Sequence, residues 1–208
     1  NSTGHAEIEY CDIRHGVYGI WLASSSNNTI TNNDISNNWG GIILESSSNN
    51  TITRNNISWN NGYGIFLFSS SNNNITGNNI LSNYWDGLHL GSSLNNNIIN
   101  NNFTNDGIVI GGYQQSHYNS HNIPSNNTVN GKPLYYYKDC SGFNIDGLLV
   151  GQLIIANCTD VIAKNLQINN TDVGIEAAYS TKINITSNSI SSNYYGLILD
   201  LFSNKNII

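Results

Sequence analysis

The sequence predicts an all-β solenoid, and two repeating patterns carry this prediction. A glycine followed by Ile or Leu recurs at positions 19, 41, 64, 87 and 107, with spacings of 22, 23, 23 and 20, and again at 174 and 196, which are 22 apart. Apolar pairs five positions apart fall inside each repeat, as in Ile30/Ile35 and Ile52/Ile57. A fixed period of about 20 to 50 residues is typical of solenoids, whose units bury their apolar residues only by stacking.

Residues 41–65 form one repeat unit and show how each strand is expected to arise. The unit opens on a strand whose alternation points Ile42 and Leu44 inward. Further short strands are expected around Ile52 and Ile57, with turn-forming Ser, Asn and Gly between them. Three strands per coil predict a right-handed single-stranded parallel β-helix of about 22–23 residues per coil, the hand following from the crossover rule. A leucine-rich repeat has a similar period but requires a helical half, which the pattern does not support.

Asparagine makes up about a fifth of the chain. Asn33, Asn55, Asn78 and Asn101 occupy equivalent points of successive coils. Amide side chains stacked one coil apart can form hydrogen-bonded ladders. We therefore interpret most asparagines as turn and ladder residues rather than as ligands.

One β-helix domain is predicted for residues 1–208, with regular coils over 1–110 and over 153–208. The period breaks over 111–152, which carries both prolines and the Tyr135–Tyr137 run, and Asn130-Gly131 is a strong turn signal. We expect this segment to be an excursion, in part a hairpin, on the outside of the coils. The chain starts and stops in mid-coil, which predicts either a trimmed longer protein or other copies stacked on these ends.

Composition excludes several classes of function. The net charge is −6, and the seven Lys and Arg residues are scattered singly, whereas nucleic-acid binding needs a basic stripe. No apolar run approaches the length of a membrane span. The sequence shows no initiator Met and no signal peptide, which fits a mature chain or a fragment. No cofactor is expected.

The cysteines permit one disulfide. Cys140 and Cys158 flank the irregular segment and can pair, although three cysteines leave the connectivity open. No spacing typical of a zinc site is present. A further set of potential metal ligands has unrelated spacings and gives only a weak signal: His89, His117, His121 and Cys140.

Glycosylation sequons of the form N-x-[ST] are dense. They begin at Asn1, Asn27, Asn49, Asn56, Asn74, Asn102, Asn126, Asn157, Asn169 and Asn184. Together with the scarcity of lysine, they favour an extracellular surface protein.

The SSSNNTIT units at Ser24–Thr31 and Ser46–Thr53 resemble the NosD-type parallel β-helix repeat family, which includes many large surface proteins of methanogenic archaea. Asn130–Tyr137, Gly151-Gln152 and Asn169–Ile175 resemble the non-repeat insert of those archaeal members. The resemblance implies the fold and a cell-surface location. The bacterial member that gives the family its name is a periplasmic accessory protein in copper-site assembly. Copper delivery is not expected here, because the chain has no Met and no array of His and Cys.

One pair of carboxylates is a candidate for catalysis. Asp86 and Asp106 each precede a coil-opening glycine, so we expect them to stack one coil apart, with His89 on the adjacent strand. Paired carboxylates can divide acid and base roles, as in the catalytic β-helices of pectate lyases and polygalacturonases. The alternative, which we favour, is that each Asp caps a turn. No Arg or Lys accompanies the pair in those coils.

An outward-facing apolar and aromatic stripe is the stronger signal for an interaction surface. Its members are Trp21, Ile43, Phe66, His89 and Val109, continued by Glu176 and Ile198 and flanked by Trp39, Tyr63, Trp85, Tyr194 and Tyr195. Such a stripe normally marks contact. Three alternatives remain open: coverage by the Tyr-rich excursion, contact with another subunit, or stacking against sugar rings.

These observations together predict a non-enzymatic, structural or adhesin-like module of an extracellular surface protein. Its expected partners are other copies or further domains of the same chain, and end-to-end packing of coils would extend it into a fibre. The alternative hypothesis is a carbohydrate-binding or carbohydrate-active β-helix that uses the Trp21/Phe66 face, with Asp86 and Asp106 as acids.

Overall fold

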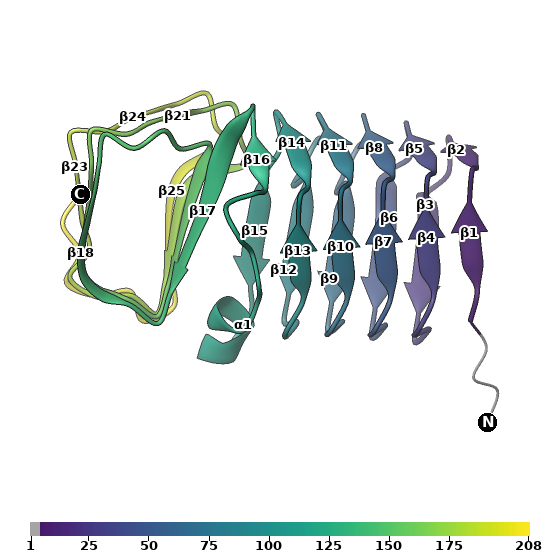
Figure 1. Ribbon diagram of the computed structural model, residues 1–208, viewed down its shortest axis with the longest axis horizontal. Helices are drawn as coiled ribbons and strands as arrows, with labels where there is room; N and C mark the ends of the chain where they lie inside the picture. The colour runs from purple at the N-terminus through teal and green to yellow at the C-terminus, as the bar shows by residue number, and fades with distance from the viewer. Residues whose placement is uncertain (1–4) are drawn as a thin grey trace.

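A computed structural model describes residues 5–208, so Asn1 and its sequon lie outside the described residues. The chain forms two stacks of β coils, shown in Figure 1. The first stack ends at β15 (Ile108–Gly111), and the second begins at β17 (Lys132–Lys138). The helix α1 (Gln115–Asn119) and the short strand β16 (Thr128–Val129) lie between them. Among the described residues, no helix is long and apolar enough to cross a membrane.

Three parallel sheets make up the first stack, one strand of each per coil. The first sheet contains β1 (Glu7–Glu9), β4 (Thr29–Thr31), β7 (Thr51–Thr53), β10 (Asn74–Thr76) and β13 (Asn97–Ile99). The second begins with β2 (Asp12–Arg14), β5 (Asp34–Ser36), β8 (Asn56–Ser58), β11 (Asn79–Leu81) and β14 (Asn102–Thr104). The third contains β3 (Tyr18–Ala23), β6 (Gly40–Glu45), β9 (Ile65–Phe68), β12 (Leu88–Gly91) and β15.

The strand registers confirm the predicted coil. Ile30 lies opposite Ile52, and Ile52 lies opposite Ile75. These isoleucines are fully buried, so each coil supplies apolar side chains that only its neighbours cover. The corners between strands adopt left-handed backbone, as at Asn27 with φ 63° and Asn49 with φ 59°. Asn tolerates this conformation better than most residues, which explains its abundance.

The predicted amide ladder is present and continues one coil further than expected. In each step, Oδ1 of one Asn accepts hydrogen bonds from the backbone N–H and Nδ2 of its counterpart in the preceding coil. For Asn33 and Asn55 both distances are 3.0 Å. The full ladder runs through Asn33, Asn55, Asn78, Asn101 and Asn127. Two parallel ladders occupy other corners, through Asn28, Asn50, Asn73 and Asn96 and through Asn38, Asn60 and Asn83.

The second stack is built from the same kind of coil. Its longest sheet contains β17, β19 (Gln152–Ala156), β22 (Val173–Ala178) and β25 (Tyr195–Asp200). A second sheet contains β18 (Ser141–Asp146), β20 (Thr159–Lys164) and β23 (Asn184–Thr186). The third pairs β21 (Gln167–Asn169) with β24 (Ser189–Ser191).

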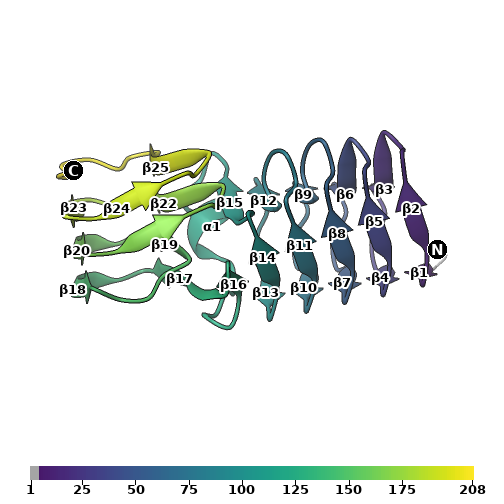
Figure 2. The same cartoon turned by 90° about the horizontal axis from the view of Figure 1, so that it is seen from above.

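The change of direction between the stacks occurs at a hairpin. β16 and β17 are antiparallel, with Val129 opposite Lys132. The two loop residues, Asn130 and Gly131, have φ of 51° and 74°, the left-handed backbone that an Asn-Gly hairpin turn requires. Figure 2 shows that the coils beyond this turn are stacked across, and not along, the direction of the first stack.

This arrangement corrects the expected excursion over residues 111–152. β17 and β18 pair in parallel with β19 and β20, so residues 132–146 belong to the first coil of the second stack. The Tyr135–Tyr137 run lies within β17. It therefore does not cover the aromatic stripe of the first stack. The physical reason is that the hairpin of β16 and β17 leads directly into the first coil of the second stack. The repeat pattern of that stack can be recognised in the sequence only in its later coils.

Cys140 and Cys158 are joined in a disulfide across a sequence separation of 18, within the first two coils of the second stack. Cys11 is free and exposed. Closing a loop of this length in the unfolded chain typically stabilises the folded state by about 3 kcal/mol.

We expect a Cys140→Ser/Cys158→Ser variant to lose about 3 kcal/mol of unfolding free energy, chiefly in the second stack. Urea denaturation followed by far-ultraviolet circular dichroism measures this loss. Cys11→Ser is the matched control and should be unchanged. An equal loss in both variants would show that the effect comes from the serine substitution and not from the cross-link.

Candidate functional site

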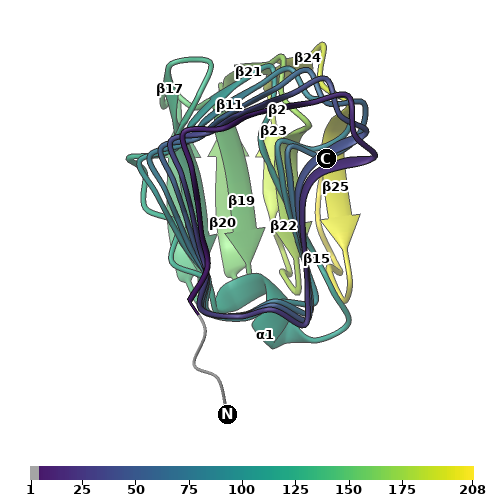
Figure 3. The ribbon, with the colours of Figure 1, turned by 90° about the vertical axis from the view of Figure 1, so that its right-hand side faces the viewer.

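The side of the second stack closes the open end of the first. Figure 3, a view along the first stack, shows β19 and β22 crossing beyond its last coil. Gln152 pairs with both backbone groups of Ile108, accepting from its N–H at 2.9 Å and donating to its C=O at 2.6 Å. Oδ2 of Asp172 accepts from the N–H groups of Gly87 and Gly107, at 2.8 and 2.7 Å. Glu176 accepts from the N–H of Ile110. These three side chains thus provide hydrogen-bond partners that a further coil would otherwise provide.

Two of the three capping groups, Asp172 and Glu176, are buried carboxyls. Asp172 and Glu176 are 3% and 1% exposed. Burial raises the pKa of both carboxyls well above the usual range, because the charged form is poorly solvated there. Glu176 was expected on the outward stripe. It does point out of its own coil, but into the junction between the stacks.

Asp106 does not form the expected surface pair with Asp86. It is fully buried and occupies the next position of the amide ladder, where its carboxyl accepts from the backbone N–H of Asn83 at 3.0 Å and from Nδ2 of Asn83 at 2.8 Å. The reason is coil length: the coil that leads to Gly107 is three residues shorter than its predecessor, since 23 − 20 = 3. Because this coil is shorter, Asp106 lies in the ladder that contains Asn83, whereas Asp86 lies at the outer corner.

Burial raises the pKa of Asp106 to about 7. A folded-state pKa above the unfolded value means that this carboxyl favours folding below about pH 4 and that the contribution is lost as the pH rises towards 7. Burial also lowers the pKa of His121 to about 4, which gives the opposite trend: the neutral ring favours folding above about pH 6.5, and this is lost as the pH falls.

Asp106→Asn should therefore stabilise the protein progressively as the pH rises from 4 to 8. Relative to the natural chain, we expect a gain of about 1.4 kcal/mol for each pH unit within the window between the two pKa values. Urea unfolding at four pH values measures this difference. Asp160→Asn, at an exposed position in the second stack, is the control and should show no such trend. A pH-independent difference for Asp106→Asn would contradict the assignment.

Three adjoining hollows follow the angle between the two stacks, and together we call them the junction groove. Their volumes are about 430, 290 and 460 Å³. The first and second hollows share Tyr63 and His89, and the second and third share Trp85 and Tyr194. Neighbouring hollows are therefore adjacent, and together they have one wall from each stack.

The outer face of β9, β12 and β15 forms the first wall. Trp21, Ile43, Phe66, His89 and Val109 lie opposite one another on neighbouring strands. Only the last three members line the groove. Trp21 lies further towards the first coil and is 55% exposed, whereas Ile43 is buried. At the corner, aromatic contacts run from Trp39 to Trp85, from Trp85 to Tyr63 and from Tyr63 to Phe66, with ring centroids 4.9, 4.9 and 4.7 Å apart.

A carboxylate and an imidazole stand together on this wall. Nδ1 of His89 lies 2.7 Å from Oδ2 of Asp86, a hydrogen bond in which the carboxylate accepts. Both side chains are partly accessible, at 22% and 15%. Of the three expected acid–base candidates, the structure thus brings Asp86 and His89 together and removes Asp106 into the core.

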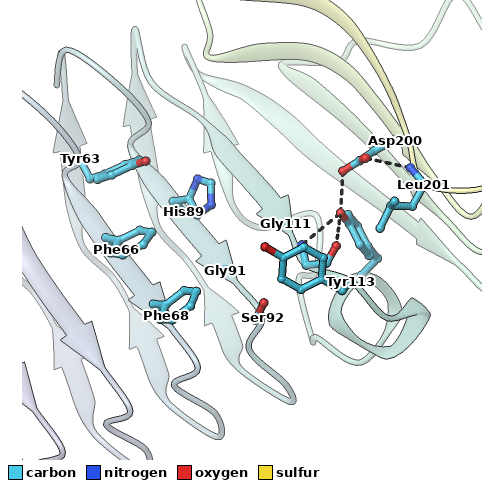
Figure 4. A pocket seen from close by; sticks show the side chains of 12 residues that line it. Tyr63, Phe66, Phe68, His89, Gly91, Ser92, Gly111, Tyr113, Asp200 and Leu201 are labelled. Atoms are coloured by element: carbon cyan, nitrogen blue, oxygen red, sulfur yellow. Dashed lines mark hydrogen bonds between the residues drawn. The ribbon is translucent and has the colours of Figure 1, made fainter.

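The second wall comes from β25 and the residue before it. Tyr194 and Tyr195 line the middle hollow, and Asp200 lines the first one. Figure 4 shows Asp200 opposite the Phe66 and His89 side chains. The Tyr118 hydroxyl donates to Oδ2 of Asp200 at 2.6 Å. Burial raises the pKa of Tyr118, so the hydroxyl keeps its proton.

The four potential metal ligands do not converge. Cys140 is consumed by the disulfide. His121 is buried and ends an amide ladder: its Nδ1 accepts from the N–H of Asn96 at 3.2 Å, and its Nε2 lies 3.0 Å from the C=O of His117. Within residues 5–208, no three His, Cys, Asp or Glu side chains are grouped to hold a metal ion.

The lining of the junction groove has a clear chemical character. It combines aromatic rings, the carboxyls of Asp86 and Asp200, and at its far end the amides of Asn105, Asn170 and Asn193. Of the described residues that line it, none is Lys or Arg. The sequence gives no signal that Tyr194 and Tyr195 face Trp85. The aromatic residues of the lining that it singles out are Tyr63, Phe66, Trp85, Tyr194 and Tyr195, and those that it misses are Phe68, Tyr84, Tyr113 and Tyr118.

Two solved structures resemble the chain at a distance: the catalytic domain of a GH87 alpha-1,3-glucanase in complex with nigerose, and an alginate lyase from Paenibacillus sp. str. FPU-7. The glucanase is 14% identical with a TM-score of 0.39, over 84% of this chain and 48% of its own. The lyase is 11% identical with a TM-score of 0.36, over 92% of this chain and 76% of its own. The chain thus spans about half the length of the glucanase domain.

No curated protein matches the sequence significantly. A family model described as "Right handed beta helix region" matches residues 1–129. That match covers more than half of the 208 residues. The chain therefore belongs to the right-handed β-helix family.

Proposed function

We propose that this protein is an extracellular, adhesin-like β-helix module that binds a polysaccharide chain in the junction groove. The observation that carries the proposal is the row of three adjacent hollows along the junction, with aromatic side chains on both walls. A linear groove suits an extended polymer, aromatic rings suit the apolar faces of sugars, and amides and carboxylates suit their hydroxyls.

The charge of the groove supports a polysaccharide without carboxylates. Asp86 and Asp200 line it, and no Lys or Arg among the described lining residues offsets them. A polyuronate would bring its negative charges next to these carboxyls, and like charges at close range disfavour binding.

Binding without cleavage is the outcome that the carboxyls favour. Glycoside hydrolysis commonly requires two carboxyls that flank the scissile bond. Asp106, the expected partner of Asp86, is fully buried and hydrogen-bonded to Asn83. The two remaining groove carboxyls, Asp86 and Asp200, line different hollows. We therefore expect the bound polymer to stay intact, with no new reducing ends.

An extracellular location is supported by three observations. The Cys140–Cys158 disulfide is typical of oxidising compartments. Five of the sequon asparagines are exposed in the structure, namely Asn27, Asn49, Asn56, Asn102 and Asn126. The resemblance of the corner units to NosD-type repeats of archaeal surface proteins agrees with this location. The second stack covers the last coil of the first stack, so we propose no contact with another copy at that coil.

Affinity electrophoresis in gels that contain a neutral glucan, a mannan, chitosan or polygalacturonate tests the proposal. We expect retardation by at least one of the first three and none by polygalacturonate. Trp85→Ala and Tyr194→Ala, one from each wall, should weaken binding about tenfold or more, because central aromatic residues dominate such interfaces.

Tyr10→Ala is the matched control, since Tyr10 is 76% exposed and lies on the first coil, outside the groove. It should bind like the natural chain. Thermal unfolding of each variant separates lost binding from lost structure. No retardation by any of the neutral or amino polymers, or equal retardation of correctly folded groove variants, would refute the proposal.

A further inference from the structure

The middle hollow of the junction groove has the composition of a cation site. It has a volume of about 290 Å³ and is lined by four aromatic rings, Asp86, His89 and Val109. The rings come from both stacks: Tyr63 and Trp85 from the first, Tyr194 and Tyr195 from the second. Four rings and one carboxylate around a small hollow are more than sugar stacking requires.

The rings are arranged as two corners. Tyr63 and Trp85 have centroids 4.9 Å apart and planes inclined by 72°. Tyr194 and Tyr195 have centroids 4.8 Å apart and planes inclined by 84°. Rings inclined in this way have faces that point in different directions. The negative faces of aromatic rings attract cations, best of all those of tryptophan.

Asp86 supplies the charge. Its Oδ2 is engaged by His89 at 2.7 Å. Its Oδ1 has no hydrogen-bond partner among the described residues, and its side chain is only 15% exposed. No Lys or Arg of the described chain lines the hollow. A carboxylate that is largely removed from water and has an unused oxygen is stabilised by a cation more than by a neutral group.

We propose that this aromatic cage, formed by Tyr63, Trp85, Tyr194, Tyr195 and Asp86, binds an organic ammonium group. The inference extends the proposed function, on which it rests for the source of the amine: a protonated amino-sugar unit of the polysaccharide would place its ammonium in the cage. A small free cation such as a quaternary amine shares the same chemistry, and the experiment below distinguishes the two sources.

The first arm of the test needs no polysaccharide. Choline and its uncharged counterpart 3,3-dimethylbutan-1-ol have nearly the same shape and differ in charge. We expect choline to shift the Trp85 indole N–H resonance in ¹H–¹⁵N spectra, with an affinity about tenfold or more above that of the alcohol. Asp86→Asn, which keeps an acceptor for His89, and Tyr194→Ala should each weaken choline binding about tenfold.

Trp59→Ala is the control, because Trp59 is 58% exposed and does not line the cage. Its choline affinity should equal that of the natural chain, and the Trp59 resonance should not move. Equal affinity for choline and the alcohol, or unchanged choline binding in Asp86→Asn, overturns the proposal.

The second arm identifies the source of the amine. A chitosan oligosaccharide that binds about tenfold more tightly than its N-acetylated form assigns the cage to an amino sugar. Choline binding without binding of either oligosaccharide supports the cage with a small free cation and refutes an amino-sugar polymer as its ligand. Binding of both oligosaccharides alike, with no binding of choline, overturns the cage and leaves polysaccharide binding standing.

Discussion

Replacing Asn55 by alanine should lower the unfolding free energy of the first stack by about 3 to 5 kcal/mol. Oδ1 of Asn55 accepts from the backbone N–H and Nδ2 of Asn33, and its Nδ2 donates to the C=O of Ile30 at 3.0 Å. All three residues are buried. The substitution therefore leaves a backbone donor and a backbone acceptor without partners in the core, each at a cost of about 1 to 3 kcal/mol, and it also opens a small cavity.

Asn56→Ala is the matched control in the same corner. Asn56 belongs to an outer ladder, with exposed hydrogen bonds to Asp34 and Asn79. Water replaces those bonds, so a loss below about 1 kcal/mol is expected. Urea denaturation followed by tryptophan fluorescence measures both variants, and it reports the first stack because all four tryptophans lie there, at positions 21, 39, 59 and 85. Similar losses in both variants would mean that the inner ladder is not a main source of stability.

Replacing Asp172 by alanine should cost the first stack a similar amount, about 3 to 5 kcal/mol, although Asp172 belongs to the second stack. Its Oδ2 accepts hydrogen bonds from the N–H groups of Gly87 and Gly107. Without the carboxyl, two buried donors lose their acceptor. The two stacks should then separate more easily, and the amide protons of Gly87 and Gly107 should exchange with solvent faster.

Two variants sharpen this test. Asp172→Asn keeps an acceptor oxygen and removes the ionisable group, so most of the stability should return. Asp160→Asn neutralises an exposed carboxyl that pairs with Lys182 at 3.5 Å, and a loss below about 1 kcal/mol is expected. If the exchange of the Gly87 and Gly107 amides is unchanged in Asp172→Ala, the carboxyl does not hold the junction.

Much of the first stack could be predicted because its pattern is local and repeated. The spacing of Ile30, Ile52 and Ile75 fixed the register, and the Asn33 ladder followed from the same period. A repeat of this kind reports the same physical environment several times, so a single misleading residue has little weight. The Asn130-Gly131 turn was also predictable, because left-handed backbone at two successive positions strongly restricts residue choice.

The candidate site was less predictable. Asp86 and Asp106 look equivalent in sequence because both precede a glycine, yet a coil shorter by three residues, 23 − 20 = 3, places only Asp86 at the surface. The prediction of a surface pair assumed that successive coils have the same number of residues. The sequence singled out the aromatic residues at the preceding corners. Which residues lie across the groove from them depends on the orientation of the second stack relative to the first.

The sequence by itself determined the parallel β coils, their period of 22–23 residues, the inward isoleucines and the Asn33 amide ladder of the first stack. All of these depend on contacts between equivalent residues of adjacent coils, which a periodic pattern records directly. Only the tertiary structure decided that Gln152, Asp172 and Glu176 close the open end of that stack, and that Tyr194 and Tyr195 face Trp85 across a groove. The reason is that the second stack meets the first side-on. This packing pairs residues more than 40 positions apart, as Gln152 with Ile108, and follows no period that the chain could display.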